Sequence, residues 1–157
     1  MAFISDLDSL ANYYPPTGFK FLVRFLEIGE IPVIDSFFQE VTGLRASVET
    51  ESYRQADRTY DQFLPTKVTF ETLKLKRGYT RNSALSLWVR NAIENFDFLP
   101  ATVHIQLLDR NNGPLASWTV SDAIPVHWGI TEFNAESSNL VIESLELKYE
   151  FFRQNKT

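Results

Sequence analysis

The sequence predicts a mainly β fold, an antiparallel β-sandwich or barrel that carries one α-helix. Most of the chain alternates apolar and polar residues, which is the period-2 pattern of strands with one buried face. Thirteen Phe and six Tyr in 157 residues agree with this class, because aromatic side chains are favoured on pleated surfaces. Only one segment, about 80–95, has the periodicity of an amphipathic helix. We expect a single domain over residues 1–157, long enough to bury a hydrophobic core.

The N-terminal part is expected to form an arm and a first strand. Residues 1–14 are the arm, which ends where Pro15–Pro16 and the nearby Gly18 interrupt regular structure. The segment GFKFLVRFLEI then has strand periodicity, with apolar residues on both faces. Both faces of this strand are therefore expected to be covered, one of them by another surface such as a second subunit.

The segment SFFQEVTGLRASVETESYR predicts a strand, a turn at Thr42–Gly43 and a second, notably polar strand. Residues 54–67, RQADRTYDQFLPTK, have mixed charge and no usable periodicity, so we expect a long loop there. Loops of this length in compact domains are often functional. In KVTFETLKLKRG the apolar positions change parity, which predicts a β-bulge near Glu71–Thr72.

The helix is expected over about residues 80–95, with Thr80 or Asn82 as its N-cap. Its apolar stripe is expected to pack on the sheet or over a barrel mouth. The residues of this stripe are Leu85, Trp88, Ala92 and Phe96.

Three further stretches predict the remaining strands. TVHIQLLD and LASWTV flank Asn112–Gly113, which predicts a hairpin with a type I′ turn. IPVHWGI and LVIESLELKYEFF follow. In the last of these the apolar residues share one face, with Glu143 as the exception.

Catalytic chemistry is not expected. The chain contains no Cys, which excludes disulfides, thiolate metal sites and a cysteine nucleophile. Its two histidines, His104 and His127, lie in strand-like segments without metal-ligand spacing, and no nucleophile elbow or glycine-rich phosphate loop is found. We predict no catalytic residue, no cofactor site and no metal site.

The overall charge and hydropathy restrict the class of protein. A net charge of −5 argues against general nucleic-acid binding. The N-terminus does not have the pattern of a signal peptide, and no apolar run reaches the roughly 20 residues of a membrane helix. These observations predict a protein made in the cytoplasm, without insertion into a membrane.

From about residue 13 to residue 153, the chain resembles the tail-tube proteins of contractile injection systems and myophages. Five stretches carry the resemblance in order: YYPPTGFKFLVRF, FFQEVTGL, LKRGYTRNSALSLWVRNAIENFDFLP, LLDRNNGPLASWTVSDAIPVHW and FNAESSNLVIESLELKYEFF. One departure is that RQADRTYDQFLPTK lacks the glycines that many tube proteins have before an LPG-like turn. This departure leaves open whether the chain is the repeated tube subunit or a specialised ring near the baseplate or tip.

The resemblance implies a small antiparallel β-barrel of two packed sheets with one flanking helix. It implies hexameric rings in which strands of all subunits join around a channel, and stacked rings that a contracting sheath drives into a target. The implied partners are further copies of the chain, sheath and baseplate proteins, and cargo in the lumen. The implied location is a phage tail or an extracellular or cell-bound injection particle.

Three groups of residues are expected to serve such an assembly. The polar ribbon Ser47, Glu49 and Glu51 suits a water-filled lumen, and the loop is where rings are expected to stack. The candidate stacking residues are Arg54, Asp57, Arg58 and Asp61. A basic set is either a solvated strand face or a contact with sheath or neighbour; it comprises Lys74, Lys76, Arg77, Arg81 and Arg90.

Three alternatives remain at this point. A baseplate-proximal or terminator ring protein of the same fold forms a single ring that does not polymerise. A ligand-binding β-barrel requires an apolar cavity, whereas the apolar positions here are all needed for the core. An enzyme ranks last, because the two histidines support no set of nucleophile, base and orienting group.

Overall fold

The computed structural model describes residues 19–26, 28, 34–81, 83–131, 136 and 141–156, with the backbone alone for 34–36. The expected arm, 1–14, lies outside the described residues. The first half contains β1 (Lys20–Leu26), β2 (Ile34–Phe38), β3 (Glu40–Thr42), β4 (Ala46–Tyr53), β5 (Gln62–Phe70) and β6 (Leu73–Gly78). The second half contains α2 (Ala84–Asn95), β7 (Ala101–Leu108), β8 (Pro114–Ile130), β9 (Ile142–Lys148) and β10 (Phe151–Gln154). The expected mainly β class with one helix is thus confirmed for the described chain.

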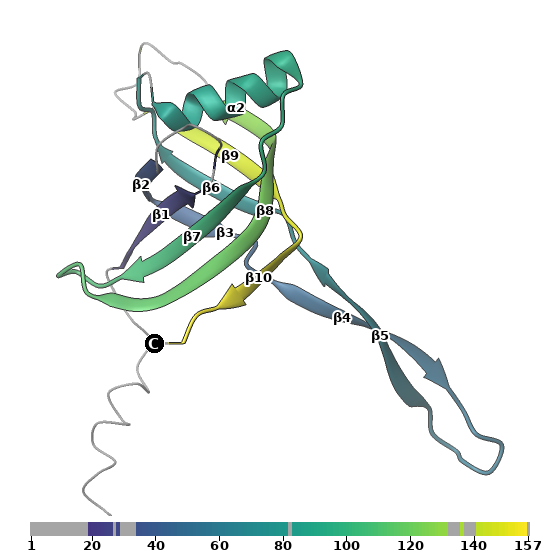
Figure 1. Cartoon of the computed structure of the whole chain (residues 1–157). Helices are drawn as coiled ribbons and strands as arrows, with labels where there is room; N and C mark the ends of the chain where they lie inside the picture. The colour runs from purple at the N-terminus through teal and green to yellow at the C-terminus, as the bar shows by residue number, and fades with distance from the viewer. Residues whose placement is uncertain are drawn as a thin grey trace, which may run out of the picture.

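Eight strands form one antiparallel sheet in the order β2-β1-β7-β8-β9-β6-β3, with β10 also paired to β8. The two edge strands, β2 and β3, are consecutive in the chain and meet at Gln39, whose N–H donates to the Lys76 carbonyl at 2.8 Å. The sheet is therefore curled strongly (Figure 1). Its hydrogen-bonded ladder stays open, because the edge strands β2 and β3 pair with β1 and β6 and not with each other.

The second sheet is a two-stranded hairpin of β4 and β5, which projects away from the curled sheet (Figure 1). The expected loop at 54–67 is therefore too long: residues 54–61 form the loop, while 62–67 belong to β5. The expected bulge near Glu71–Thr72 is also wrong. Those two residues are where the chain leaves the hairpin and enters the curled sheet, and the register shift of the hairpin lies between Glu49 and Thr50.

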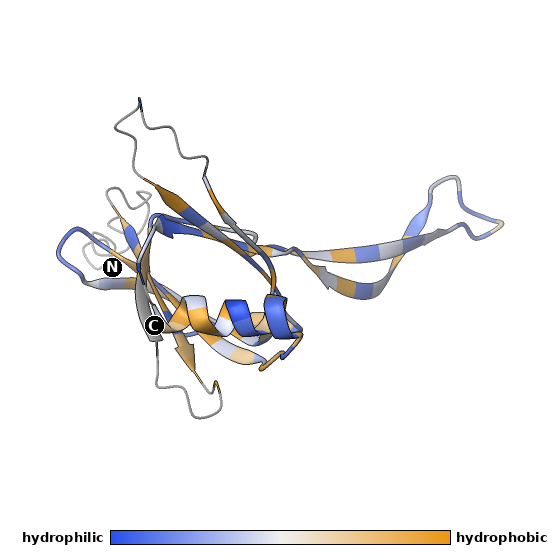
Figure 2. Cartoon of the chain, turned by 90° about the horizontal axis from the view of Figure 1, so that it is seen from above, coloured by the Kyte–Doolittle hydropathy of each residue, from blue (hydrophilic) through white to orange (hydrophobic). Residues whose placement is uncertain are grey.

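Helix α2 crosses one end of the curled sheet (Figure 2). Its expected stripe is confirmed at Leu85, Trp88 and Ala92, which are fully buried in the described chain. The Trp88 ring lies 5.6 Å from that of Phe25, and its indole N–H donates to the Leu99 carbonyl at 2.8 Å. These contacts fix the helix on the core, which further comprises Val23, Leu73, Leu75, Val103, Ile105, Val120, Leu145 and Leu147.

The start of the helix differs from the expectation, whereas its end at Asn95 agrees with it. The N-cap is Ser83, not Thr80 or Asn82, because the Ser83 hydroxyl accepts from the Ser86 N–H at 3.1 Å and the helix begins one residue later. At the other end, Phe96 lies outside the helix in the left-handed conformation. Its side chain is therefore exposed, and its expected place in the packing stripe is wrong.

The β7–β8 hairpin exists as expected, but its turn is not type I′. Asn112 has a φ of 64° while Gly113 does not have a positive φ, and a type I′ turn requires positive φ at both central residues. The Asp109 carboxylate instead accepts from the N–H groups of Asn111 and Gly113, at 2.8 and 2.7 Å. The connection is consequently longer than the two-residue turn that the sequence predicts.

Candidate assembly surfaces

The β4–β5 hairpin has one mainly apolar and one mainly polar face. Cross-strand partners lie on the same face of a ribbon. One face therefore combines Ala46 with Phe70, Val48 with Val68, Thr50 with Pro65 and Ser52 with Phe63. The register shift near Glu49 keeps these residues on one side along the whole hairpin. We call this side the apolar hairpin face.

The apolar hairpin face is open to solvent. Val48, Phe63 and Val68 are 58%, 69% and 54% exposed. An isolated two-stranded hairpin is at best marginally stable in water, and contiguous exposed apolar surface marks an interaction site. The hairpin is thus the surface of the described chain that most clearly requires a partner.

The expected lumen residues lie together on the opposite, polar side of the hairpin. Ser47, Glu49 and Glu51 occupy successive positions of one face of β4, and all are exposed. Glu49 is not a free carboxylate, since Lys67 of β5 lies 3.2 Å from it. This face carries opposite charges side by side and can remain in contact with water, although Leu64 and Tyr53 also lie on it.

The hairpin loop holds the four expected stacking residues, all of them exposed. Arg54 and Asp61 form an ion pair of 2.8 Å with each other across the base of the loop. Arg58 lies over the Tyr60 ring, 5.8 Å from its centroid. Arg54 and Asp61 therefore close the loop, whereas Asp57 and Arg58 lie farther toward its tip.

The hairpin root is held by an aromatic cluster that sequence reasoning missed. Phe70 lies 6.0 Å from Tyr149 and 5.5 Å from Phe152, between ring centroids. The Tyr149 hydroxyl donates to the Gly43 carbonyl at 3.2 Å. Desolvation by burial, together with the charge of Glu71, raises the pKa of Tyr149 from 10.0 to about 12. The hydroxyl therefore stays protonated at neutral pH, and its contribution to stability falls as the pH rises from about 10 toward 12.

The basic set does not form one patch. Lys74 and Lys76 are exposed on β6, where they pair with Glu146 at 3.7 Å and Glu40 at 3.1 Å. Arg90 pairs with Glu94 at 3.4 Å on the helix. Arg81 is exposed in the connection before the helix. The outer face of β6 is thus a row of ion pairs with the strands on either side.

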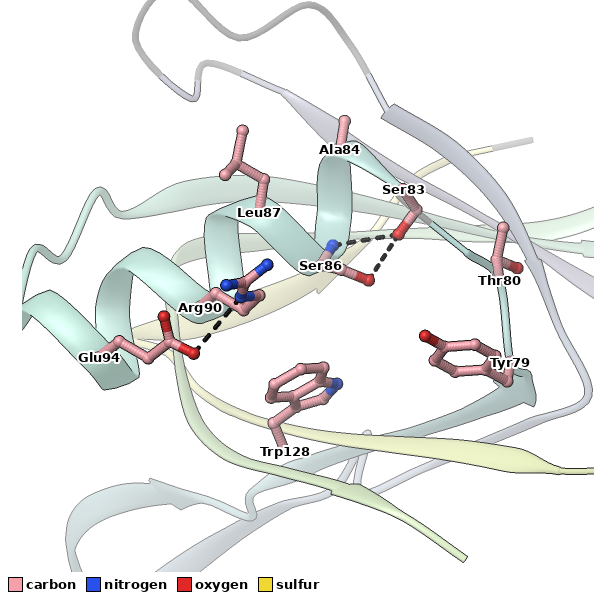
Figure 3. Close-up of a pocket in the computed structure, with 9 residues that line it drawn as sticks. All are labelled: Tyr79, Thr80, Ser83, Ala84, Ser86, Leu87, Arg90, Glu94 and Trp128. Atoms are coloured by element: carbon pink, nitrogen blue, oxygen red, sulfur yellow. Dashed lines mark hydrogen bonds and ion pairs between the residues drawn. The ribbon is translucent and has the colours of Figure 1, made fainter.

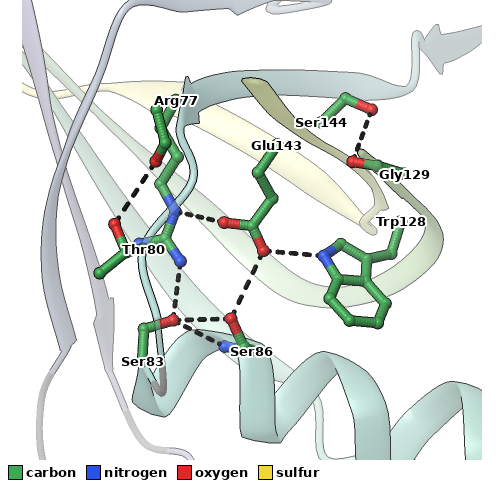
Figure 4. A network of polar contacts seen from close by, with 9 residues as sticks. Arg77, Thr80, Ser83, Ser86, Trp128, Gly129, Glu143 and Ser144 are labelled. Atoms are coloured by element: carbon green, nitrogen blue, oxygen red, sulfur yellow. Dashed lines mark hydrogen bonds and ion pairs between the residues drawn. The ribbon is translucent and has the colours of Figure 1, made fainter. Parts of the chain in front are cut away.

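Arg77 is a correction to the expected contact surface, because it points inward. Its guanidinium donates to Glu143 at 2.8 Å, and both residues are buried, 4% and 3% exposed. Arg77 also donates to Ser83 at 2.7 Å (Figure 4). Glu143 accepts in addition from the Trp128 indole at 2.8 Å. Strand parity could have revealed that both side chains point inward, since Arg77 shares a strand face with Leu73 and Leu75, and Glu143 shares one with Leu145 and Leu147.

This polar network joins the start of α2 to the sheet. The Ser83 hydroxyl, which caps the helix, contacts the Ser86 hydroxyl at 2.8 Å, and Ser86 in turn donates to Glu143 at 3.4 Å. In Figure 4 the ion pair lies between the helix N-terminus and the Trp128 indole. The Glu143 carboxylate and the Arg77 guanidinium therefore hold the start of α2 against the sheet.

The histidines form no site with each other. The His104 Nε2 lies 2.9 Å from the Asn155 side-chain nitrogen, so this residue takes part in a polar contact between β7 and the end of the chain. Within the described residues, no group of three His, Asp or Glu side chains is arranged to hold a metal ion. Nor is there, in that part of the chain, a helix with the length and apolarity needed to cross a membrane.

A pocket of about 530 Å³ runs along α2. Tyr79 and Trp128 face the helix across it, while Leu87, Arg90 and Glu94 line the helix side (Figure 3). Thr80, Ser83, Ala84 and Ser86 complete the lining. We call it the α2 pocket. Its lining combines aromatic rings with hydroxyl groups and with the Arg90–Glu94 ion pair, whose two charges balance each other.

Comparisons with known proteins agree with this arrangement of strands and helix. Residues 17–153 match the family described as T4-like virus tail tube protein gp19. A comparison with curated proteins finds no match. Among solved structures, a chain of the anti-feeding prophage baseplate is 31% identical, with a TM-score of 0.82 over 90% of this chain and 96% of that one.

Two further solved structures share the fold at lower identity. One belongs to the extended sheath–tube complex of PVC, an extracellular contractile injection system; it is 22% identical, with a TM-score of 0.76 over 96% of this chain and 97% of that one. The other belongs to the tube-terminating cap of the anti-feeding prophage; it is 23% identical, with a TM-score of 0.76 over 100% of both chains.

Proposed function

We propose that this chain, which belongs to the T4-like virus tail tube protein family, is a structural subunit of the inner tube of a contractile injection system and not an enzyme. Copies form hexameric rings, in keeping with the six-fold symmetry of the similar anti-feeding prophage baseplate. The rings stack into a hollow tube that contraction of a sheath drives into its target. The observation that carries this proposal is the exposed apolar hairpin face, which a monomer leaves in water.

The hairpin connects copies of the chain. Its apolar face is covered by a neighbouring subunit, which removes Val48, Phe63 and Val68 from water. Pairing of its free strand edges with a neighbour satisfies backbone groups that otherwise invite uncontrolled aggregation. The aromatic cluster at the root keeps the hairpin attached to its own subunit while its far end serves another.

Replacing Val48 and Val68 by Thr tests this role. Val48→Thr/Val68→Thr keeps the β-branched shape on an exposed ribbon, so the melting temperature of the monomer is expected to change little. Assembly is expected to weaken roughly tenfold or more, because the buried apolar contacts between subunits are lost. Sedimentation velocity across a concentration series measures this. The matched control is Ser47→Thr/Thr69→Ser on the polar face; equal weakening by both variants argues against the apolar face as the contact.

The loop at the hairpin tip contacts the next ring. Its exposed charges set the register between rings more than the strength of stacking. Reversing Asp57 and Arg58 together, as Asp57→Lys/Arg58→Glu, keeps the net charge and is expected to shorten tubes in negative-stain electron microscopy. The control is Asp61→Arg/Arg54→Asp, which exchanges the two charges of the ion pair at the base of the loop and is expected to leave tube length unchanged. Tubes of unchanged length from the first variant contradict a stacking role for the tip.

The polar side of the hairpin faces the lumen. Ser47, Glu49 and Glu51 keep that surface hydrated, and the Lys67–Glu49 pair lowers its net charge. Such a surface lets cargo slide without tight binding. Sheath or neighbouring subunits contact the ion-paired outer face of β6 through Lys74 and Lys76, and through the exposed Arg81. The particle is a phage tail or an extracellular injection particle, in which baseplate proteins are further partners.

A second candidate is a specialised ring, baseplate-proximal or terminal, of the same fold. The observation in its favour is that the 31% identical chain comes from a baseplate. Negative-stain electron microscopy of the purified chain across a concentration series separates the two. Stacked rings with a central hole support the tube subunit, single rings that never stack support the specialised ring, and monomers at every concentration, even with a baseplate partner added, contradict both.

A further inference from the structure

The C-terminal end of α2 carries a residue that the isolated chain does not explain. Phe96 has φ 53° and ψ 33°, in the left-handed region, and is 84% exposed. A helix that ends in this conformation usually has Gly there, because a Cβ crowds the following carbonyl oxygen. Phe therefore adds backbone strain and, in the same position, places a phenyl ring in water. A partner that binds the phenyl ring explains why the chain keeps both the backbone strain and the exposed ring.

The surroundings of Phe96 hold it as a projecting aromatic group. The Phe98 ring meets it edge to face, 5.0 Å between centroids and at an interplanar angle of 87°. Ile93 and Leu99 nearby are also exposed. Aromatic side chains, Phe among them, are enriched in the cores of protein interfaces, where a few anchors supply most of the free energy of binding.

The α2 pocket is large enough for a phenyl ring and has aromatic residues in its lining. A cavity of about 150 Å³ is enough to hold a benzene ring, and the α2 pocket measures about 530 Å³. Its facing Tyr79 and Trp128 rings can pack against a phenyl ring in the edge-to-face geometry that aromatic pairs prefer (Figure 3). The charges beside the two features are also opposite, since Asp97 follows Phe96 and Arg81 follows the pocket residue Thr80, and both are exposed.

We propose that Phe96 of one copy of the chain inserts into the α2 pocket of a second copy. The inference rests on the proposed function, because it specifies one contact between subunits. Projection and pocket are different surfaces of the same subunit, so the contact is head-to-tail and repeats around a closed ring or along a stack. This contact involves α2 and is separate from the apolar hairpin face.

Replacing Phe96 by Gly tests whether its ring serves assembly or the stability of the single chain. Phe96→Gly removes the phenyl and relieves the left-handed strain, so the melting temperature of the monomer is expected to stay the same or rise. The concentration needed for assembly, measured by sedimentation velocity, is expected to rise roughly tenfold or more. Phe96→Tyr keeps the ring and is the matched control, expected to assemble like the original chain. Assembly of Phe96→Gly at the original concentration overturns the proposal.

Mixing two variants identifies the acceptor. Tyr79→Ala removes one wall of the α2 pocket and is expected to weaken assembly as Phe96→Gly does. In an equimolar mixture the Phe96 of the Tyr79→Ala copy can enter the intact pocket of the Phe96→Gly copy, so assembly is expected to recover in part. Absence of recovery, or normal assembly of Tyr79→Ala, overturns the pocket as the binding site. If the unmodified chain does not assemble even with a baseplate partner added, the proposed function fails. If it assembles and only the Phe96 and Tyr79 variants behave otherwise than expected, the inference alone fails.

Discussion

Arg77→Met is expected to lower the free energy of unfolding by about 3–5 kcal/mol, because it leaves the buried Glu143 carboxylate without its cation. The Trp128 indole and the Ser86 hydroxyl still donate to that carboxylate, at 2.8 and 3.4 Å, but neither carries a charge. The start of α2 is also expected to loosen, since Arg77 donates to the N-cap Ser83. Urea unfolding of the monomeric chain, followed by Trp fluorescence, measures the loss.

The matched control for this substitution is one residue away on the same strand. Lys76 forms an ion pair with Glu40 at 3.1 Å, with both side chains about half exposed. Because water and salt screen such a pair, Lys76→Met is expected to cost less than about 1 kcal/mol. The double variant Arg77→Met/Glu143→Leu is expected to recover part of the stability, since no unpaired charge remains buried. Equal losses in Arg77→Met and Lys76→Met contradict the structural role of the network.

Gly43→Ala is expected to destabilise the chain by about 2–4 kcal/mol, from backbone strain and a steric clash together. Gly43 has a φ of 92°, and a Cβ there overlaps the carbonyl oxygen of Thr72. Neither backbone segment can move aside easily, because Gly43 connects β3 to the hairpin and its carbonyl accepts from Tyr149. Thermal unfolding measures the loss. Assembly is also expected to weaken, because the hairpin then leaves the sheet at a changed angle.

Gly129→Ala is the control for this position. Gly129 does not have a positive φ, and an added Cβ meets only side-chain atoms of His127 and Ser144, each at 3.2 Å. Those side chains can turn away, so a cost below about 1 kcal/mol is expected. A loss in Gly43→Ala no larger than that in Gly129→Ala contradicts the steric argument.

The local pattern of the sequence was sufficient for the class of fold and for the inward faces of most elements. Alternation identified β1, β7 and β9, and helical spacing identified Leu85, Trp88 and Ala92 as the packing residues of α2. The polar ribbon of Ser47, Glu49 and Glu51 could also be read, because residues two apart on a strand share a face. Each of these features depends on residues close together in the chain.

Pairing between distant strands could not be read in the same way. β3 and β4 are separated by three residues, yet β3 pairs with β6 and β4 with β5, so the hairpin leaves the sheet between them. The mixed charges and missing periodicity of 54–67 suggested a loop, although its second half is a strand. A strand exposed on both faces does not need strict alternation, which is why this signal failed.

By itself, therefore, the sequence determined a β-rich domain with one amphipathic helix and a polar strand face, since backbone geometry imposes those periods locally. Only the tertiary structure decided that Arg77 pairs with Glu143, that Ser83 caps the helix and that Phe96 projects from its end. The physical reason is that a buried charge requires a partner within hydrogen-bonding distance. Arg77 and Glu143 are 66 residues apart in the chain, and the pairing of β6 with β9 brings them together.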